Sequence, residues 1–117
     1  MKDAKITARR YQQMQITDIK VRKLFDEGPM KAVVSVTFDG QLAVHDIKVI
    51  HAREKFFIVM PSRKNPDETY RDIVHPINSQ FRSMLEREVI AAYVAECEAA
   101  EAQRLSEAEG TLMEQVL

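Results

Sequence analysis

The dipeptide Asp39-Gly40 constrains the fold of this chain more than any other feature. It follows a stretch, residues 31–38, in which apolar residues recur at every second position, and it precedes a further apolar stretch at 42–50. Asp-Gly supplies the two positive φ angles of a type I′ turn, whose twist suits a tight antiparallel hairpin. The sequence therefore predicts two paired strands over these ranges. The residues expected to share the buried face of the first strand are Ala32, Val34, Val36 and Phe38.

A further strand is expected upstream, over residues 16–25, because polar and apolar side chains alternate there. The turn residues 26–29, Asp-Glu-Gly-Pro, separate this strand from the next and make the two a hairpin. One face of the strand should be buried and the other basic. The expected buried residues are Thr17, Ile19 and Val21, and the expected polar face carries Asp18, Lys20 and Arg22.

Residues 56–60 form an unbroken apolar run, Phe-Phe-Ile-Val-Met. Such a run is typical of a strand that is covered on both faces, whereas a half-exposed strand alternates. We expect a helix to cover one face and a second copy of the chain to cover the other. The sequence therefore predicts that the protein is not a monomer.

Three prolines, Pro61, Pro66 and Pro76, divide the next stretch. Asn65-Pro66-Asp67 suits a type I turn, in which proline favours the second position. A short strand over residues 70–74 should follow and pair back across this turn.

After Pro76 the apolar period changes to that of a helix, which Asn78 or Ser79 can cap. We expect this helix to cover the sheet and to fray beyond Arg104, with a break at Gly110. The fold class is α+β: an antiparallel sheet of about four to five strands followed by one long C-terminal helix. The apolar residues that recur at three- and four-residue spacings are Phe81, Met84, Leu85, Val89, Ala92, Tyr93 and Cys97.

Composition fits one small globular domain without a membrane segment. The 117 residues suffice for a single core, and no apolar run approaches the roughly 20 residues that a spanning helix needs. The only cysteine, Cys97, cannot form an internal disulfide and is expected to be a small buried hydrophobic residue in a reducing compartment. We therefore expect a cytoplasmic protein that does not associate with a membrane.

The net charge of −1 hides an uneven distribution. Residues 1–82 carry 15 basic and 10 acidic side chains, whereas residues 83–117 carry 2 basic and 8 acidic ones. This pattern fits a nucleic-acid surface followed by an acidic tail, and it equally fits an ordinary solvated acidic helix. Charge alone leaves both interpretations open.

One long stretch resembles the signature region of the SpoVG family, named after stage V sporulation protein G. The similarity runs through residues 57–64 (Phe-Ile-Val-Met-Pro-Ser-Arg-Lys), Pro66-Asp67 and residues 70–79 (Tyr-Arg-Asp-Ile-Val-His-Pro-Ile-Asn-Ser). It extends upstream through Ile-Thr-Asp-Ile at 16–19 and Val-His-Asp-Ile-Lys-Val-Ile at 44–50. The resemblance therefore covers about residues 14 to 94.

Two departures from the family pattern stand out. Family members begin just before the Ile-Thr-Asp stretch, so Met14 matches their initiator, and residues 1–13 are either a basic arm or the product of an upstream start codon. The second departure is Glu68-Thr69, where the family commonly has a glycine. The expected division of the chain is a basic N-terminal extension at 1–13, a SpoVG-like domain at 14–105 and an acidic C-terminal tail at 106–117.

The resemblance implies a regulatory protein that binds DNA and also RNA. The family is associated in spore formers with septation, and hence cell division, and with sporulation, and in other bacteria with broader gene control. It also implies a dimer that pairs its sheets. We expect no cofactor and no small-molecule substrate.

Basic side chains between residues 53 and 82 form the expected nucleic-acid site. Guanidinium groups grip phosphate bidentately, and lysines add point charge. The plain alternative is a charged loop that is only solvated. A second basic patch, Lys20, Arg22 and Lys23, has a similar alternative, a solvated face that protects a sheet edge. The predicted contacts are Arg53, Lys55, Arg63, Lys64, Arg71 and Arg82.

No set of side chains in the sequence converges as an enzyme or a metal site requires. His45 and His51 lie on one strand, too far apart to share an ion. Asp72 and His75 can meet around Pro76, but no nucleophile lies in sequence reach. We expect only a structural hydrogen bond between them and predict neither catalysis nor metal binding.

A second function from a different class fits the same residues. Residues 61–76 can dock on a division or regulatory protein, without physiologically relevant nucleic-acid binding. The net charge of −1 keeps this protein-interaction module credible. It predicts weak nucleic-acid binding that vanishes near physiological salt.

Overall fold

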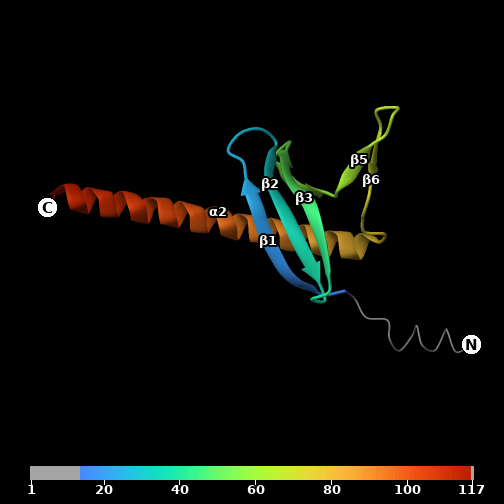
Figure 1. The fold of residues 1–117 in the computed structure, drawn as a ribbon, viewed down its shortest axis with the longest axis horizontal. Helices are drawn as coiled ribbons and strands as arrows, with labels where there is room; N and C mark the ends of the chain where they lie inside the picture. The colour runs from blue at the N-terminus through green and yellow to red at the C-terminus, as the bar shows by residue number, and fades with distance from the viewer. Residues whose placement is uncertain (1–13, 117) are drawn as a thin grey trace, which may run out of the picture.

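A computed structural model describes residues 14–116, with side chains placed as far as Glu107. The expected N-terminal extension at 1–13 lies outside the described residues. Within them the chain forms a four-stranded antiparallel sheet, a separate two-stranded hairpin and one long helix (Figure 1), which confirms the α+β class. The elements are β1 Ile16–Leu24, β2 Met30–Phe38, β3 Leu42–Ala52, β4 Lys55–Val59, β5 Ser62–Lys64, β6 Tyr70–Asp72 and α2 Ser79–Val116.

The hairpin predicted from Asp39-Gly40 is confirmed. Both residues have positive φ, 53° and 62°, as a type I′ turn requires. The Gln41 N–H closes the turn by donating to the Phe38 carbonyl at 2.9 Å. From this turn β2 and β3 pair antiparallel, and the main sheet has the order β1-β2-β3-β4.

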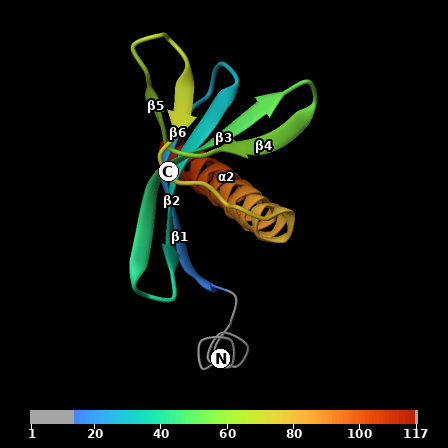
Figure 2. The ribbon, with the colours of Figure 1, turned by 90° about the vertical axis from the view of Figure 1, so that its right-hand side faces the viewer.

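One face of the main sheet forms the core beneath α2. The helix contacts all four strands and lies along this face, as the two views in Figures 1 and 2 show. Leu85 and Val89 of α2 are fully buried against it, and each such side chain stabilises the fold by about 1.5–3 kcal/mol. The alternation predicted for β2 is confirmed, since its inward residues are buried: Ala32, Val34, Val36 and Phe38.

The buried face of β1 differs from the prediction at one residue. A bulge between Ile16 and Asp18 shifts the alternation, because an extra residue on one strand re-aims its neighbours. Thr17 is therefore exposed, and its hydroxyl donates to the Thr37 carbonyl at 3.3 Å and accepts the Gly40 N–H at 2.9 Å. The expected burial of Thr17 is wrong; Ile16, Ile19 and Val21 pack on the core instead.

The apolar run at 56–60 is covered on one side. Ile58 and Met60 are buried, whereas Phe56 and Phe57 are 39% and 37% exposed. Phe56 lies near Tyr93 of α2, with ring centroids 5.8 Å apart. The helix thus covers one face of β4, and the second copy expected on the other face stays a prediction.

The start of α2 agrees with the sequence, and its end does not. Asn78 caps the helix, since its Oδ1 accepts the Phe81 N–H at 2.7 Å. The helix then runs to Val116, so the expected fraying beyond Arg104 and the break at Gly110 are wrong. A glycine costs an exposed helix only about 1 kcal/mol, which flanking good helix formers offset. The C-terminal half of α2 extends beyond the sheet (Figure 1).

Cys97 lies half-buried on α2 and is free, which only partly agrees with the expected buried position. It lines a pocket of about 310 Å³ between α2 and the β1–β2 connection. Burial, together with a hydrogen bond to Cys97, raises the pKa of Tyr93 in the same wall above its usual value.

Candidate nucleic-acid interface

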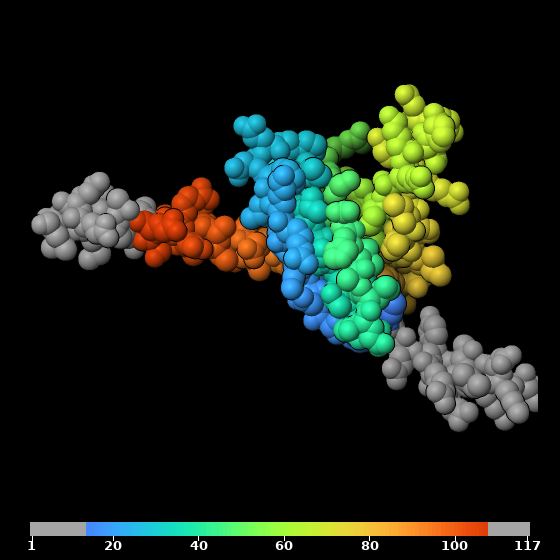
Figure 3. Space-filling view, viewed as in Figure 1, coloured from blue at the N-terminus to red at the C-terminus, as the bar shows by residue number. Residues whose placement is uncertain are grey.

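The two short strands β5 and β6 form a hairpin that projects from the body of the protein (Figures 1 and 3). We call residues 62–72 the arm. Its register pairs Ser62 with Asp72, Arg63 with Arg71 and Lys64 with Tyr70. The predicted pairing of a short strand from Tyr70 back across the proline turn is therefore confirmed, and its register places Arg71 opposite Arg63.

The tip of the arm is the predicted proline turn. The Glu68 N–H donates to the Asn65 carbonyl at 3.0 Å, with Pro66 at the second position. Asp67 Oδ1 accepts the Thr69 hydroxyl at 2.6 Å and the Thr69 N–H at 3.1 Å. These two bonds, the hydroxyl bond first, lower the pKa of Asp67 below its ordinary value, because they favour the charged carboxylate.

Glu68, at the place where the resemblance implies a glycine, has a φ of 68°. This is the left-handed region, which glycine enters without a steric penalty and other residues rarely adopt. The departure from the family pattern therefore leaves the turn in the shape that glycine favours.

The centre of the arm carries a pair of like charges. Directly opposite residues in an antiparallel pair have Cβ atoms about 4.5–5.5 Å apart on one face, and like charges there are destabilising. Arg63 and Arg71 are such a pair, both are exposed, and neither forms an ion pair with any described residue. On the opposite face Lys64 lies across from Tyr70, which is 70% exposed.

The acidic residues of the arm lie away from this centre. Asp67 and Glu68 are at the tip, and Asp72 is at the base, across from Ser62. The arm as a whole is therefore neutral, while its middle is a concentrated cationic site. Such a site fits an anion held between two guanidinium groups.

The other predicted residues lie elsewhere. Arg53 occupies the β3–β4 turn, with a φ of 53°, and Lys55 begins β4. Both are exposed. The β3–β4 hairpin and the arm rise toward the same end of the molecule and diverge from each other (Figures 1 and 2), so Arg53 and Lys55 lie on a hairpin separate from the arm.

The side chain of Arg82 is hydrogen-bonded to strand β4 of the main sheet. Its Nη2 donates to the Ile58 carbonyl at 3.3 Å, and Glu86 Oε2 accepts the Ile58 N–H at the same distance. These two side chains of α2 satisfy the outward backbone groups of Ile58 on the edge strand. Arg82 thus has a structural contact that the sequence did not indicate, and its role toward nucleic acid stays a prediction.

Asp72 and His75 are not joined. His75 Nδ1 is hydrogen-bonded to the Pro76 carbonyl at 3.0 Å, so the bond expected between Asp72 and His75 is wrong. Within residues 14–107, whose side chains the structure describes, no group of three or more His, Cys, Asp or Glu side chains could hold a metal ion.

No helix in the described part of the chain is long and apolar enough to cross a membrane.

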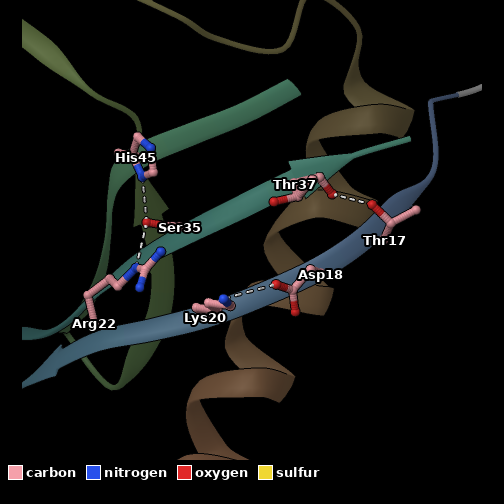
Figure 4. Close-up of polar contacts among 7 residues, drawn as sticks. All are labelled: Thr17, Asp18, Lys20, Arg22, Ser35, Thr37 and His45. Atoms are coloured by element: carbon pink, nitrogen blue, oxygen red, sulfur yellow. Dashed lines mark hydrogen bonds and ion pairs between the residues drawn. The ribbon is translucent and has the colours of Figure 1, made fainter. Parts of the chain in front are cut away.

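A second polar cluster joins β1, β2 and β3, and sequence reasoning missed it. Ser35 Oγ accepts a hydrogen bond from Arg22 Nε at 3.2 Å and is bonded to His45 Nδ1 at 2.8 Å (Figure 4). The available signal was Ser35 itself, a single polar residue within the run of valines of β2.

Together these elements define a class of small α+β protein, in which a four-stranded sheet carries a helix on one face and an exposed arm with a cationic centre. The sequence comparisons give that class its name. The chain belongs to the SpoVG family, whose sequence model matches residues 14–95.

Several curated relatives support this assignment, each with the name "Putative septation protein SpoVG". The relative from Caldanaerobacter subterraneus subsp. tengcongensis is 58% identical over 80 residues, which are 68% of this chain and 88% of the relative. The relative from Acetivibrio thermocellus is 54% identical over 84 residues, 72% of this chain and 89% of the relative. That from Caldicellulosiruptor saccharolyticus is 51% identical over 88 residues, 75% of this chain and all of the relative.

Proposed function

We propose that this chain is a non-enzymatic regulatory protein that binds DNA and RNA through its arm. The observation that carries the proposal is the direct pairing of Arg63 with Arg71, without an acidic partner among the described residues. A phosphate between the two guanidinium groups would turn a repulsive pair into two charge-assisted contacts. Lys64 would add a third positive charge. The names of the relatives support a role in septation, and sporulation and gene regulation follow from the family resemblance alone.

Recognition of this kind is directed mainly at the nucleic-acid backbone. Phosphate contacts position a protein on its target and carry little sequence information. Each neutralised phosphate releases counterions, so that affinity falls steeply as salt rises. Arg53 and Lys55 would lengthen the contact from the neighbouring turn.

A homodimer would present two arms to one nucleic acid. Its support is the apolar surface that a single chain leaves open: Ile73, Val74 and Ile77 after the arm are 64%, 42% and 89% exposed. Phe57 of β4, which is 37% exposed, is a further apolar side chain that the single chain leaves open. Since Arg82 and Glu86 occupy the backbone groups of Ile58, we expect the copies to pack through side chains there. Size-exclusion chromatography with light scattering should give twice the chain mass, and a monomer would contradict this expectation.

The binding proposal is tested by fluorescence anisotropy with labelled duplex DNA and labelled single-stranded RNA. The test variant is Arg63→Ala with Arg71→Ala, and the matched control is Arg87→Ala with Arg104→Ala, two exposed arginines on α2. We expect the arm variant to lose tenfold or more in affinity, from two charge-assisted contacts, and the control to bind as the native protein does. Equal affinity of all three proteins would contradict the proposal.

A second variant separates loss of binding from loss of folding. Arg71→Glu places opposite charges across the arm, which should hold the hairpin together at least as well as the native pair. We therefore expect unchanged or higher thermal stability together with weakened binding of nucleic acid.

The alternative candidate is a protein-interaction module that docks through residues 61–76. The exposed Ile73 and Val74 within this segment favour it, because adjoining apolar side chains on a surface often mark contacts between proteins. Under this alternative, nucleic-acid binding would vanish near physiological salt, and Ile73→Ser would abolish capture of a division or regulatory protein.

A further inference from the structure

The face of the main sheet that points away from α2 is open over β1, β2 and β3 (Figure 3). Its central residue is Ser35, which lies between Val34 and Val36, both fully buried on the opposite face. Lys20 is the cross-strand neighbour of Ser35 on β1. The open face therefore has a polar and basic centre.

Ser35 is the only buried polar or charged residue that the described part of the chain contains, at 6% exposure. No helix covers it. Its burial comes from Arg22 and His45, whose side chains meet over its hydroxyl from the two neighbouring strands (Figure 4). A buried hydroxyl is stable only when it is hydrogen-bonded, and both partners meet that need.

The hydrogen bonds to Ser35 hold the exposed side chains of Arg22 and His45 in place. Arg22 uses its Nε–H on Ser35, and its terminal nitrogens form no ion pair with any described residue. Asp18, the acidic residue nearest along β1, is paired with Lys20 at 3.9 Å. Ser35 can in turn donate to His45 Nδ1, and in that tautomer Nε2–H is a further donor at the surface.

We propose that Arg22, Ser35 and His45 form a phosphate subsite for single-stranded nucleic acid on the open face of the sheet. The inference rests on the proposed function and adds to it a second surface, distinct from the arm. Arg22 contacts the phosphate, His45 contacts the phosphate or a base, and Ser35 is a positioning residue that holds both. Lys20 supplies additional positive charge.

Geometry favours a single strand over a duplex. Single-stranded nucleic acid is bound on open surfaces where bases stack on planar side chains, including the histidine ring and the arginine guanidinium group. Arg22 and His45 supply two such planar groups on adjacent sides of one serine. The bases of duplex DNA are stacked inside the helix and cannot stack on these side chains. A duplex could therefore interact with this face only through its phosphate charges.

The test compares Arg22→Gln with a matched control, Arg104→Gln, which removes the same charge from the distal part of α2. Labelled single-stranded RNA and duplex DNA are titrated by anisotropy over a range of salt. We expect Arg22→Gln to weaken binding of the single strand about tenfold and to reduce its salt slope by about 0.7. Duplex affinity should change no more than in the control.

A measurement on the native protein guards against misfolding of the variant. The side-chain Nε–H signal of Arg22 is followed by NMR while single-stranded RNA is added. We expect this signal to shift, and the amide signals of Ser35 and His45 with it. A native protein that binds RNA without moving these signals, or an Arg22→Gln variant that binds as the control does, would overturn the subsite alone. A native protein that binds neither nucleic acid would overturn the proposed function as well.

Discussion

At the scale of single residues, the left-handed backbone positions mark where the chain turns and, at Asp46, where the register of β3 against β2 shifts. Gly28 and Gly40 occupy two of them, and the remainder carry side chains. Such positions are sterically unfavourable for residues with a Cβ atom, so a substitution by glycine there should change the free energy of unfolding. The non-glycine residues with positive φ are Asp39, Asp46, Arg53, Glu54 and Glu68.

Glu68→Gly should stabilise the protein. Its φ of 68° costs a residue with a Cβ atom about 1–2 kcal/mol, and glycine avoids this cost. Glycine also raises the conformational entropy of the unfolded chain, which offsets part of the gain in stability. We expect a net gain of up to about 1 kcal/mol in the free energy of unfolding, measured by urea denaturation. Glu68→Ala is the control, because it removes the same carboxylate but keeps Cβ; an equal gain there would assign the effect to charge.

Thr69→Ala should raise the pKa of Asp67 toward its ordinary value of 3.8. The hydroxyl of Thr69 is the larger cause of the lowered pKa, and its N–H is the smaller one. Because the folded-state pKa is lowered, the stabilisation that ionised Asp67 provides is complete above the ordinary value and is lost as pH falls through the folded-state value. Titration of the Asp67 carboxyl by NMR measures this, and Thr69→Ser, which keeps the hydroxyl, should leave the pKa low.

At the scale of elements, the sequence predicted the parts that local chemistry decides. The Asp39-Gly40 turn, the inward face of β2, the Asn78 cap and the arm with its proline tip were all predictable, because a turn, a two-residue period or a capping amide suffices for each. The bulge at Thr17 and the hydrogen bond from Arg82 to the Ile58 carbonyl could not be predicted, because both depend on contacts with residues distant in the sequence.

The cap of α2 gives the test at this scale. Asn78→Ala leaves the Phe81 N–H without its acceptor, and we expect the free energy of unfolding to fall by about 1 kcal/mol. Asn78→Asp keeps the acceptor and adds a favourable charge at the helix N-terminus, so its stability should match or exceed the native value. Equal losses in both variants, measured by thermal denaturation, would show that the amide group contributes through some other contact.

At the scale of the whole molecule, the basic side chains lie on several separate surfaces, and the sequence alone did not show how they are divided among these surfaces. It placed Arg63, Lys64 and Arg71 on one hairpin, which the structure confirms. It joined Arg53, Lys55 and Arg82 to the same site, whereas the structure distributes them over a separate turn and a helix. The Arg22–Ser35–His45 cluster was beyond prediction, because residues of three strands meet only once the register of the sheet is known.

The central claim, that the arm neutralises phosphates, is tested most directly by the salt dependence of duplex DNA affinity. The slope of log affinity against log salt counts neutralised phosphates, at about 0.9 for each. The native protein is compared with a variant that carries Arg63→Ala, Lys64→Ala and Arg71→Ala. The account predicts that the slope falls in magnitude by about two to three in the variant. An unchanged slope, with or without a change in affinity, would show that these three side chains do not contact the phosphates.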